Sequence, residues 1–316
     1  MSIRILGTGS YVPEKIVTND DLAKLVDTSD EWIMQRVGVK ERHVSEGETA
    51  ADMAAKAAER AIESAGLKGE DIDLIIAASI SGETLSPTVA GMVQKKIGAT
   101  CPAFDVNSAC SGFLFALDTA VSYMMRGYKN ILVIGAERLS KLVDWTDRST
   151  CVIFGDGAGA FVIAPGDGYL SSKLYTSGDN SVIEIPSFGG SSPFYKADLK
   201  HPYIFMDGQE TFKFAVNKIV EDIKEVTAAA NLTLDDIDYV VTHQANIRIM
   251  EFASKRLKVP KEKFVINIDK YGNTSSASVA IAFDELNRSG RLKRGDKIVM
   301  SAFGGGLSSA ACVIEW

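Results

Sequence analysis

The chain of 316 residues is 46% hydrophobic, which is enough for a large core in one big domain or two ordinary ones. Its formal net charge of −7 argues against a general nucleic-acid-binding protein. No run of apolar residues is long enough to predict a membrane span, and the first residues lack a secretory signal pattern. The four scattered cysteines have neither zinc spacing nor an export context, so we expect a cytoplasmic protein with reduced thiols.

Strand-like and helix-like segments alternate along the chain, which is typical of an α/β protein. Residues 49–65 predict a helix, because Thr49 and Asp52 form a capping signal and Gly66 follows its end. Further on, we expect a strand at 73–78, a helix at 88–97, a strand, corner and helix within 102–117, and a strand at 131–134.

Cys110 lies at the corner within 102–117, where a helix begins. A thiol there is close to the positive end of the helix dipole, so we expect a lowered pKa of Cys110 and a nucleophilic thiolate. The alternative is a buried structural cysteine. The local sequence alone leaves both interpretations open.

The second half of the chain repeats the order of the first. Residues 236–241 echo residues 71–76, 165 positions later. The remaining elements that we expect are helices near 209–230 and 247–257, strands at 264–268 and 297–300, and a helix from Ser275 onward. This pattern indicates the duplication of a whole domain, with one half at 1–165 and the other at 166–316. We interpret residues 165–202, rich in Gly, Ser, Asp and Pro, as the connection between halves plus an excursion.

Equivalent corners of two packed halves are expected to meet near a shared axis. Cys110 lies at the first corner, Asn273 at the matching corner, and His243 follows the strand predicted at 239–242. Ligands of open α/β sheets bind at this edge, which favours a catalytic Cys110. Gly305, in a run of three glycines, allows backbone N–H groups to approach a substrate carbonyl.

A cysteine with a histidine and an asparagine permits two kinds of thioester chemistry. In a hydrolase, the histidine activates the cysteine and admits water. In an enzyme that forms carbon–carbon bonds, the histidine and the asparagine donate hydrogen bonds to the oxygen of a thioester enolate. The three residues alone do not choose between these reactions.

Longer motifs surround these three residues. They are Gly7-Thr8-Gly9-Ser10-Tyr11-Val12-Pro13, Thr18-Asn19-Asp20-Asp21-Leu22, the Cys110 corner, Phe154-Gly155-Asp156-Gly157-Ala158-Gly159-Ala160, His243-Gln244-Ala245-Asn246, Gly272-Asn273-Thr274 and Phe303-Gly304-Gly305-Gly306. With them, the chain resembles the β-ketoacyl-acyl-carrier-protein synthase III family of the thiolase superfamily over almost its full length. The resemblance implies a thiolase-like α/β fold of two pseudo-duplicated halves in five αβαβα layers.

The resemblance also implies an acyltransferase that initiates type II fatty acid biosynthesis. It would condense a primer acyl-CoA with malonyl-acyl carrier protein and release CoA and CO2, with no metal or cofactor beyond the CoA thioesters. Cys110 would carry the primer acyl group, and His243 and Asn273 would stabilise the enolate. The N–H groups of Cys110 and Gly305 would form an oxyanion hole, and Phe303 would wall the primer pocket.

The resemblance assigns roles to further residues as well. Those implied in CoA binding are Thr28, Trp32, Arg36, Arg148, Gly208 and Asn246, with the adenine clamped between Trp32 and Arg148. Without the resemblance, Trp32 would be read as a half-buried helix aromatic. The positions implied in docking an acidic carrier protein are Lys213, Arg248, Lys255 and Arg256, for which ordinary solvated charge is the alternative.

Ser86 is the position that bears on the choice of primer. Acetyl-preferring relatives carry a phenylalanine there, which reaches across a homodimer into the primer pocket of the neighbour. A serine leaves more room, so we expect a homodimer that tolerates primers longer or bulkier than acetyl.

Other functions compete with this one. A degradative thiolase would need a second catalytic cysteine followed two residues later by glycine, and Cys312-Val313-Ile314 lacks that pattern. A specialised relative that joins an acyl-CoA to a different partner in secondary metabolism is not excluded by the motifs. A Cys–His thioester hydrolase would release free acid, and a non-catalytic scaffold does not explain the intact Cys, His and Asn set.

Overall fold

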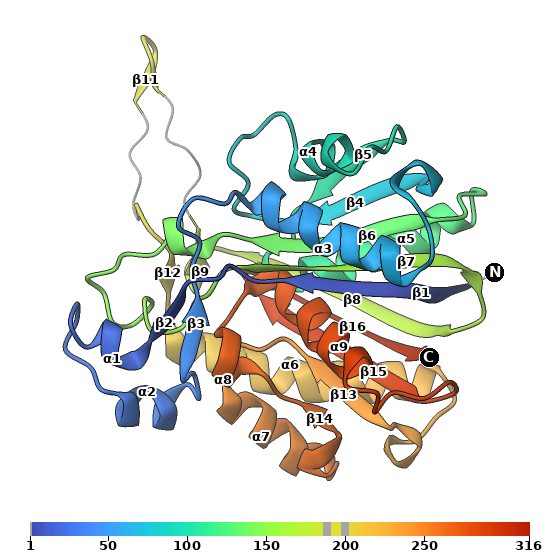
Figure 1. Ribbon diagram of the computed structural model, residues 1–316. Helices are drawn as coiled ribbons and strands as arrows, with labels where there is room; N and C mark the ends of the chain where they lie inside the picture. Colours follow the sequence, from blue (N-terminus) through green and yellow to red (C-terminus); the bar gives the residue numbers. More distant parts are fainter. Residues whose placement is uncertain (1, 186–190, 197–201) are drawn as a thin grey trace.

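Two five-stranded sheets with the same strand order form the centre of the protein (Figure 1). They are seen in a computed structural model, in which residues 2–185, 191–196 and 202–316 are described. The first sheet has the order β1-β7-β6-β4-β5 and the second β8-β16-β15-β13-β14. In each sheet the last three strands are parallel and the first two are antiparallel to their neighbours.

The bounds of these elements follow the predicted duplication. The first sheet contains β1 (Ser2–Tyr11), β4 (Leu74–Ala78), β5 (Ala103–Val106), β6 (Ile131–Glu137) and β7 (Gly157–Gly166). The second contains β8 (Tyr169–Asp179), β13 (Tyr239–Thr242), β14 (Phe264–Val265), β15 (Lys297–Gly304) and β16 (Gly306–Glu315). The helices are α1 (Asn19–Leu22), α2 (Asp30–Arg36), α3 (Ala50–Ser64), α4 (Val89–Lys96), α5 (Gly112–Met124), α6 (Gly208–Ala229), α7 (Ile247–Leu257), α8 (Ile268–Tyr271) and α9 (Ser278–Arg288).

The helices and sheets alternate in five layers, as expected. Helices α3 and α4 cover the outer face of the first sheet, and α6 and α7 cover the outer face of the second. Helices α5 and α9 lie between the sheets. Strand β4 shows why helices cover both faces of a sheet. Its Ile75 packs outward against α3, while Leu74 and Ile76 pack inward. Strands buried on both faces read as continuous apolar runs.

Local signals in the sequence determine where several helices begin. Thr49 caps α3 and forms a capping box with Asp52, and Ala65 and Gly66 end the helix. Helix α7 spans 247–257 as predicted, and the Asn246 side chain caps its first turn.

Two expectations were wrong in detail. The strand predicted at 264–268 ends at Val265, because β14 pairs only with β13 at the sheet edge and Ile268 already begins α8. The region 165–202 contains the long edge strand β8, which pairs with β16. Its alternating exposed and half-buried polar residues resemble a loop in sequence. Residues 186–190 and 197–201 of that region lie outside the described part of the chain.

Three short strand pairs complete the part of the fold that the structure describes. They are β2 (Ile16–Thr18) with β3 (Glu41–His43), β9 (Ile183–Glu184) with β12 (Phe205–Met206), and β10 (Ser191–Ser192) with β11 (Tyr195–Lys196). The division of the chain between residues 165 and 166 into two domains stays a prediction. Within the described residues, no helix combines the length and the hydropathy of a membrane span.

Candidate active site

Cys110 lies in a tight corner between β5 and α5. The corner is a short 3₁₀ turn, η2 (Ala109–Ser111), and Ala109 enters it with a φ of 44°. This left-handed conformation is costly for a residue other than glycine, and such strained residues cluster at functional sites. The Ser111 hydroxyl lies 2.7 Å from the hydroxyl of Ser308 and so ties the corner to β16.

Gly304 allows the second half of the chain to press against this corner. A Cβ on Gly304 would lie 2.7 Å from the Cβ of Cys110 and 2.9 Å from its backbone nitrogen. Only glycine permits so close an approach. As a result, the following residue, Gly305, presents its N–H to the sulfur of Cys110.

The pKa of the Cys110 thiol differs in direction from the expectation. Burial raises it to about 11, and the negative charge of Glu137 acts in the same direction. The Ser275 hydroxyl and the N–H groups of Cys110 and Gly305 act against burial, but they do not overcome it. The start of a helix therefore does not suffice to ionise a thiol enclosed by apolar walls.

His243 directly follows β13 and is 2% exposed. Its Nδ1 atom lies 2.6 Å from the hydroxyl oxygen of Ser278, and its ring meets the edge of Phe303 with a centroid distance of 5.3 Å. Burial lowers the pKa of His243 to about 3, so the imidazole is neutral at physiological pH. The Gln244 N–H lies 3.5 Å from the same hydroxyl. We assign the Ser278 proton to His243 Nδ1, which leaves an N–H on Nε2.

Asn273 lies at the corner of the second half. Its backbone pairs with the turn after Cys151: its N–H donates to Ile153 and its carbonyl accepts from Gly155. Its Oδ1 atom accepts a hydrogen bond of 2.8 Å from the Ser275 N–H. Because the oxygen is engaged, the amide NH2 group is left as a donor. The Gly155 motif is thus a structural turn that positions Asn273.

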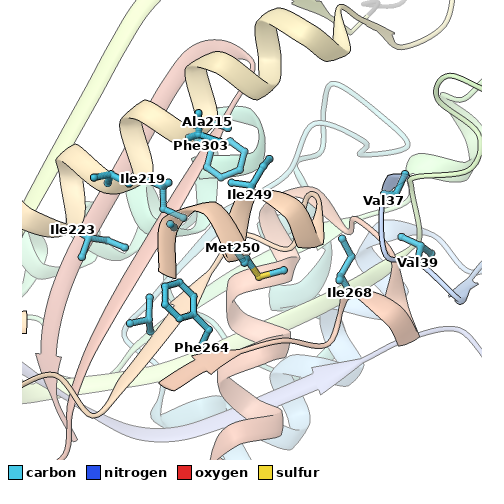
Figure 2. Close-up of a cluster of buried hydrophobic side chains, with 14 of the residues drawn as sticks. Val37, Val39, Ala215, Ile219, Ile223, Ile249, Met250, Phe264, Ile268 and Phe303 are labelled. Atoms are coloured by element: carbon cyan, nitrogen blue, oxygen red, sulfur yellow. The ribbon is translucent and has the colours of Figure 1, made fainter. Parts of the chain in front are cut away.

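One cavity brings these residues together. Cys110, His243 and Asn273 line it with Phe303 and Gly305. Its other walls are mostly apolar and include Ile80, Leu139, Ile153, Phe154, Ile183, Ile185, Ile204, Met206, Phe212 and Ile249. Phe303 belongs to the cluster that packs α6 and α7 on the second sheet, where Figure 2 shows it beside Ile249 and Ala215. The cavity therefore combines a nucleophile and hydrogen-bond donors with an apolar wall.

Known proteins are similar to this chain over its whole length. The family models for 3-oxoacyl-[acyl-carrier-protein] synthase III match residues 104–178 and, for the C-terminal part, residues 227–316. A β-ketoacyl-[acyl-carrier-protein] synthase III of Clostridium acetobutylicum is 51% identical over 321 residues, which cover 100% of this chain and 99% of the relative. The chain belongs to this family. It is an acyl-transferring condensing enzyme.

Solved structures agree with this membership. The 3-oxoacyl-[acyl-carrier-protein] synthase III of Aquifex aeolicus superposes with a TM-score of 0.92 at 44% identity and covers 99% of this chain and 100% of its own. The priming β-ketosynthase of the R1128 polyketide biosynthetic pathway reaches a TM-score of 0.90 at 35% identity and covers 99% of this chain and 96% of its own.

The residues predicted for CoA binding in this family member fall into two groups. Gly208 and Asn246 line the cavity. Trp32 and Arg148 form a pair outside it, with the guanidinium 5.2 Å from the indole centroid. A purine can enter between them only if Arg148 moves away, since the arginine already covers the indole face.

Two other predicted residues lie near this second group. Arg36 is exposed, and its carbonyl accepts a hydrogen bond of 3.0 Å from the Asn246 side chain. The hydroxyl oxygen of Thr28 is buried and has no hydrogen-bond partner.

The predicted docking residues are all exposed. Arg248, Lys255 and Arg256 lie on α7, and Arg248 stacks over Phe212 while Arg256 stacks over Phe252. Lys213 lies on neighbouring α6 and is paired with Glu210 at 2.6 Å. Its charge is therefore partly neutralised, and the three α7 residues make the stronger basic surface.

Ser86, Cys151 and Cys312 lie away from the cavity. Ser86 is exposed and does not line the cavity of its own chain. Cys151 and Cys312 are each 1% exposed, which confirms that they are core residues. Sequence reasoning missed Ser278, Ser275 and Glu137, whose roles depend on which corner each one meets in space.

Proposed function

We propose that this enzyme condenses a primer acyl-CoA with malonyl-acyl carrier protein and releases CoA and CO2, as the first step of type II fatty acid biosynthesis. The observation that carries the proposal is the convergence of Cys110, His243 and Asn273 on one cavity. Names of relatives with near-complete coverage support the reaction class. The chemistry uses side chains and thioester substrates alone, without a metal or cofactor.

In the first step, Cys110 attacks the thioester carbon of the primer. Negative charge then develops on the carbonyl oxygen. The N–H groups of Cys110 and Gly305 both reach the sulfur, so an oxygen on the adjoining carbon lies in their range. The apolar wall formed by Phe303 and its neighbours holds the primer chain.

In the second step, malonyl-acyl carrier protein loses CO2 and leaves an enolate. The Nε2–H of His243 and the amide NH2 of Asn273 donate hydrogen bonds to the enolate oxygen. Both donors are fixed from behind, His243 by Ser278 and Asn273 by the Ser275 N–H. A neutral histidine can fill this role because, with the Ser278 hydroxyl donating to Nδ1, its one proton stays on Nε2 as a donor.

The substrates are proposed to enter past Gly208 and Asn246. Trp32 and Arg148 would hold the adenine of CoA, Arg36 would meet its phosphates, and Thr28 would line the same entrance. An acidic carrier protein would dock on the basic surface of α7 through Arg248, Lys255 and Arg256, with Lys213 beside them. Opposite charge on the two surfaces steers such an encounter.

We further propose a cytoplasmic homodimer in which Ser86 of each copy faces the primer pocket of the other. In this arrangement the small serine admits primers longer or bulkier than acetyl. The exposed position of Ser86 beside Leu85, which is 83% exposed, supports a covered surface at this loop. The four free cysteines fit a reducing compartment.

The test is to incubate the enzyme with a labelled acyl-CoA and malonyl-acyl carrier protein and to identify the products. The proposal predicts CO2 and a β-ketoacyl-acyl carrier protein in equal amounts, and neither from Cys110→Ser. Release of free acid without CO2 would instead identify a hydrolase. Condensation only with another acceptor would identify a specialised relative.

A further inference from the structure

The corner that carries Cys110 has a counterpart in the second half of the chain. The counterpart is η6 (Ser275–Ala277), which packs against β6 as η2 packs against β15. Ser275 has a φ of 48°, close to the 44° of Ala109, so the residue that corresponds to Cys110 is Ser276. The two corners are in contact with each other.

Glu137, at the end of β6, lies behind this second corner and is fully buried. Its carboxylate accepts hydrogen bonds of 2.5 Å from the Ser81 hydroxyl, 2.7 Å from the Ser276 hydroxyl and 3.2 Å from the Ile80 N–H. No lysine or arginine is among the groups that bond it within the described chain. Arg138, the next residue, points instead toward Glu83.

The Ser275 hydroxyl connects Glu137 to the nucleophile. It lies 3.3 Å from Oε1 of Glu137 and also hydrogen-bonds to the sulfur of Cys110. It therefore forms a short path for a proton between the thiol and the carboxylate. The groups that face Glu137 are Cys110 at the first corner, Ser275 and Ser276 at the second, and Ile80 and Ser81 after β4.

The hydrogen bonds of Ser276 show that this carboxyl group can hold a proton. Its hydroxyl has one proton but lies 3.0 Å from the Ala78 carbonyl and 2.7 Å from Glu137 Oε1. When Glu137 is protonated it donates to Ser276, and Ser276 donates to Ala78, so every group is satisfied. Burial raises the pKa of Glu137 to about 7, so it changes charge in the working range of the enzyme.

His243 is a weaker acceptor than Glu137 for the proton of Cys110. Burial lowers its pKa to about 3, whereas the thiol that must lose its proton has a pKa of about 11. The pKa of Glu137 lies closer to that of the thiol than the pKa of His243 does, so transfer of the proton to Glu137 is the less costly of the two. In addition, His243 Nε2 is required as a donor in the condensation step.

We propose that Glu137 stores the proton of Cys110 and that Ser275 relays it. As Sγ bonds to the acyl carbon, the Sγ–H proton passes to Ser275 Oγ while the hydroxyl proton of Ser275 passes to Glu137. CoA leaves as a thiolate and takes its proton from solvent. After condensation Cys110 leaves as a thiolate, and the proton returns to it from Glu137 through Ser275.

This inference rests on the proposed acylation of Cys110, but it has a test of its own. The acylation rate by acyl-CoA alone is measured by rapid quench between pH 6 and 9, without malonyl-acyl carrier protein. Failure of the wild-type enzyme to become acylated would contradict the proposed function. Normal acylation of the wild-type enzyme, together with an equal acylation rate of the Glu137→Gln variant, would contradict only the relay.

The direction of the effect separates a relay from simple electrostatics. The charge of Glu137 raises the pKa of Cys110, so its removal alone would speed acylation at neutral pH. The relay predicts the opposite, a loss of about a hundredfold in Glu137→Gln, as is usual for a lost proton acceptor. The wild-type rate is expected to rise with pH up to about 7 and then level off, whereas the variant rises without levelling.

Ser275→Ala provides a second variant that tests the same claim without the carboxylate being changed. Ala109 shows that alanine adopts this backbone conformation in the same fold. The relay predicts slow acylation without levelling in Ser275→Ala as well. Ser122→Ala, an exposed serine of α5 that makes no contact with Glu137 or Cys110, is the matched control and keeps the wild-type profile. Acylation in Glu137→Gln or Ser275→Ala as fast as in Ser122→Ala would overturn the proposal.

Discussion

The Ser278 hydroxyl holds His243 through its Nδ1 atom at 2.6 Å, at the first residue of α9. The contact joins the carboxyl end of β13 to α9, a helix of the central layer. It fixes which ring nitrogen carries the proton, because a hydroxyl that donates to Nδ1 leaves the N–H on Nε2. The donor that faces the substrate is therefore set by a residue that touches no substrate.

Ser278→Ala removes this constraint. We expect decarboxylation of malonyl-acyl carrier protein to slow by about tenfold, because the wrong tautomer presents no donor to the enolate. Acylation of Cys110 is expected to stay unchanged. Release of labelled CO2 and the amount of acyl-enzyme are the two readouts. Ser289→Ala, at the exposed end of the same helix, serves as control, and an equal loss in both variants would contradict this role.

Gly304→Ala tests the contact between the two halves. The new Cβ would lie 2.7 Å from the Cβ and 2.9 Å from the backbone nitrogen of Cys110, and a backbone atom cannot move aside as a flexible side chain can. We expect a loss of about 1–3 kcal/mol in the free energy of unfolding, with Cys110 acylation lost or nearly so. Denaturant titration and rapid quench measure the two effects. Gly47→Ala, where a Cβ would meet nothing within 4 Å, is the matched control.

The buried neutral His243 makes the fold sensitive to acid. Its pKa of about 3 in the folded state lies below the ordinary value of 6.5, so the unfolded chain binds a proton first. This contribution to stability is present above pH 6.5 and is lost as the pH falls toward 3. It amounts to about 2 kcal/mol between pH 6.5 and 5. In urea titrations, the free energy of unfolding of His243→Gln should decline less than that of the wild type over this pH range. Parallel declines in the two proteins would contradict this contribution of His243.

The basic surface of α7 is expected to affect the binding of the carrier protein and not the reaction with acyl-CoA. Reversal of charge in the double variant Arg248→Glu and Lys255→Glu should raise the KM for malonyl-acyl carrier protein by about tenfold, most strongly at low salt. Acylation by acyl-CoA should not change. The double variant Lys68→Glu and Lys129→Glu, at two exposed lysines of the first half, changes the net charge by the same amount and serves as control. A KM that follows net charge rather than position would refute the assignment.

Ser86→Phe tests the link between this loop and the choice of primer. A phenylalanine would occupy space in the pocket of the neighbouring copy, so we expect the activity to narrow toward acetyl-CoA. A chain-length series of acyl-CoAs, compared between the variant and the wild type, measures the change. Strict acetyl preference in the wild-type enzyme would contradict the proposed tolerance.

The sequence predicts the fold well where its signals are local or repeated. The capping signal at Thr49 predicts the start of α3, and the echo of residues 71–76 in 236–241 predicts two matching halves. The convergence of Cys110, His243 and Asn273 followed from that duplication. Strand β8 was missed because an edge strand with one exposed face lacks the apolar run of a central strand.

The electrostatics of the site could not be predicted from the sequence in the same way. The helix start at Cys110 suggested a lowered pKa, but the enclosing walls come from distant segments and raise it. Glu137 reads as the polar end of an apolar strand, and only the packing of η6 on β6 brings it near the thiol. Several of these contacts, such as those of Glu137 with Ser275 and Ser276, join residues that lie more than a hundred positions apart in the chain.

The most direct test of the account is a single-turnover chase of the acyl-enzyme. Enzyme loaded with an acyl-CoA is freed of excess substrate, its intact mass is measured, and malonyl-acyl carrier protein is added. The proposed function predicts one acyl group on Cys110 and none on the Cys110→Ser variant. The acyl group on Cys110 is then transferred to the carrier protein, with the release of one CO2. A wild-type enzyme that gains no acyl group, or that loses it to water, would contradict the account.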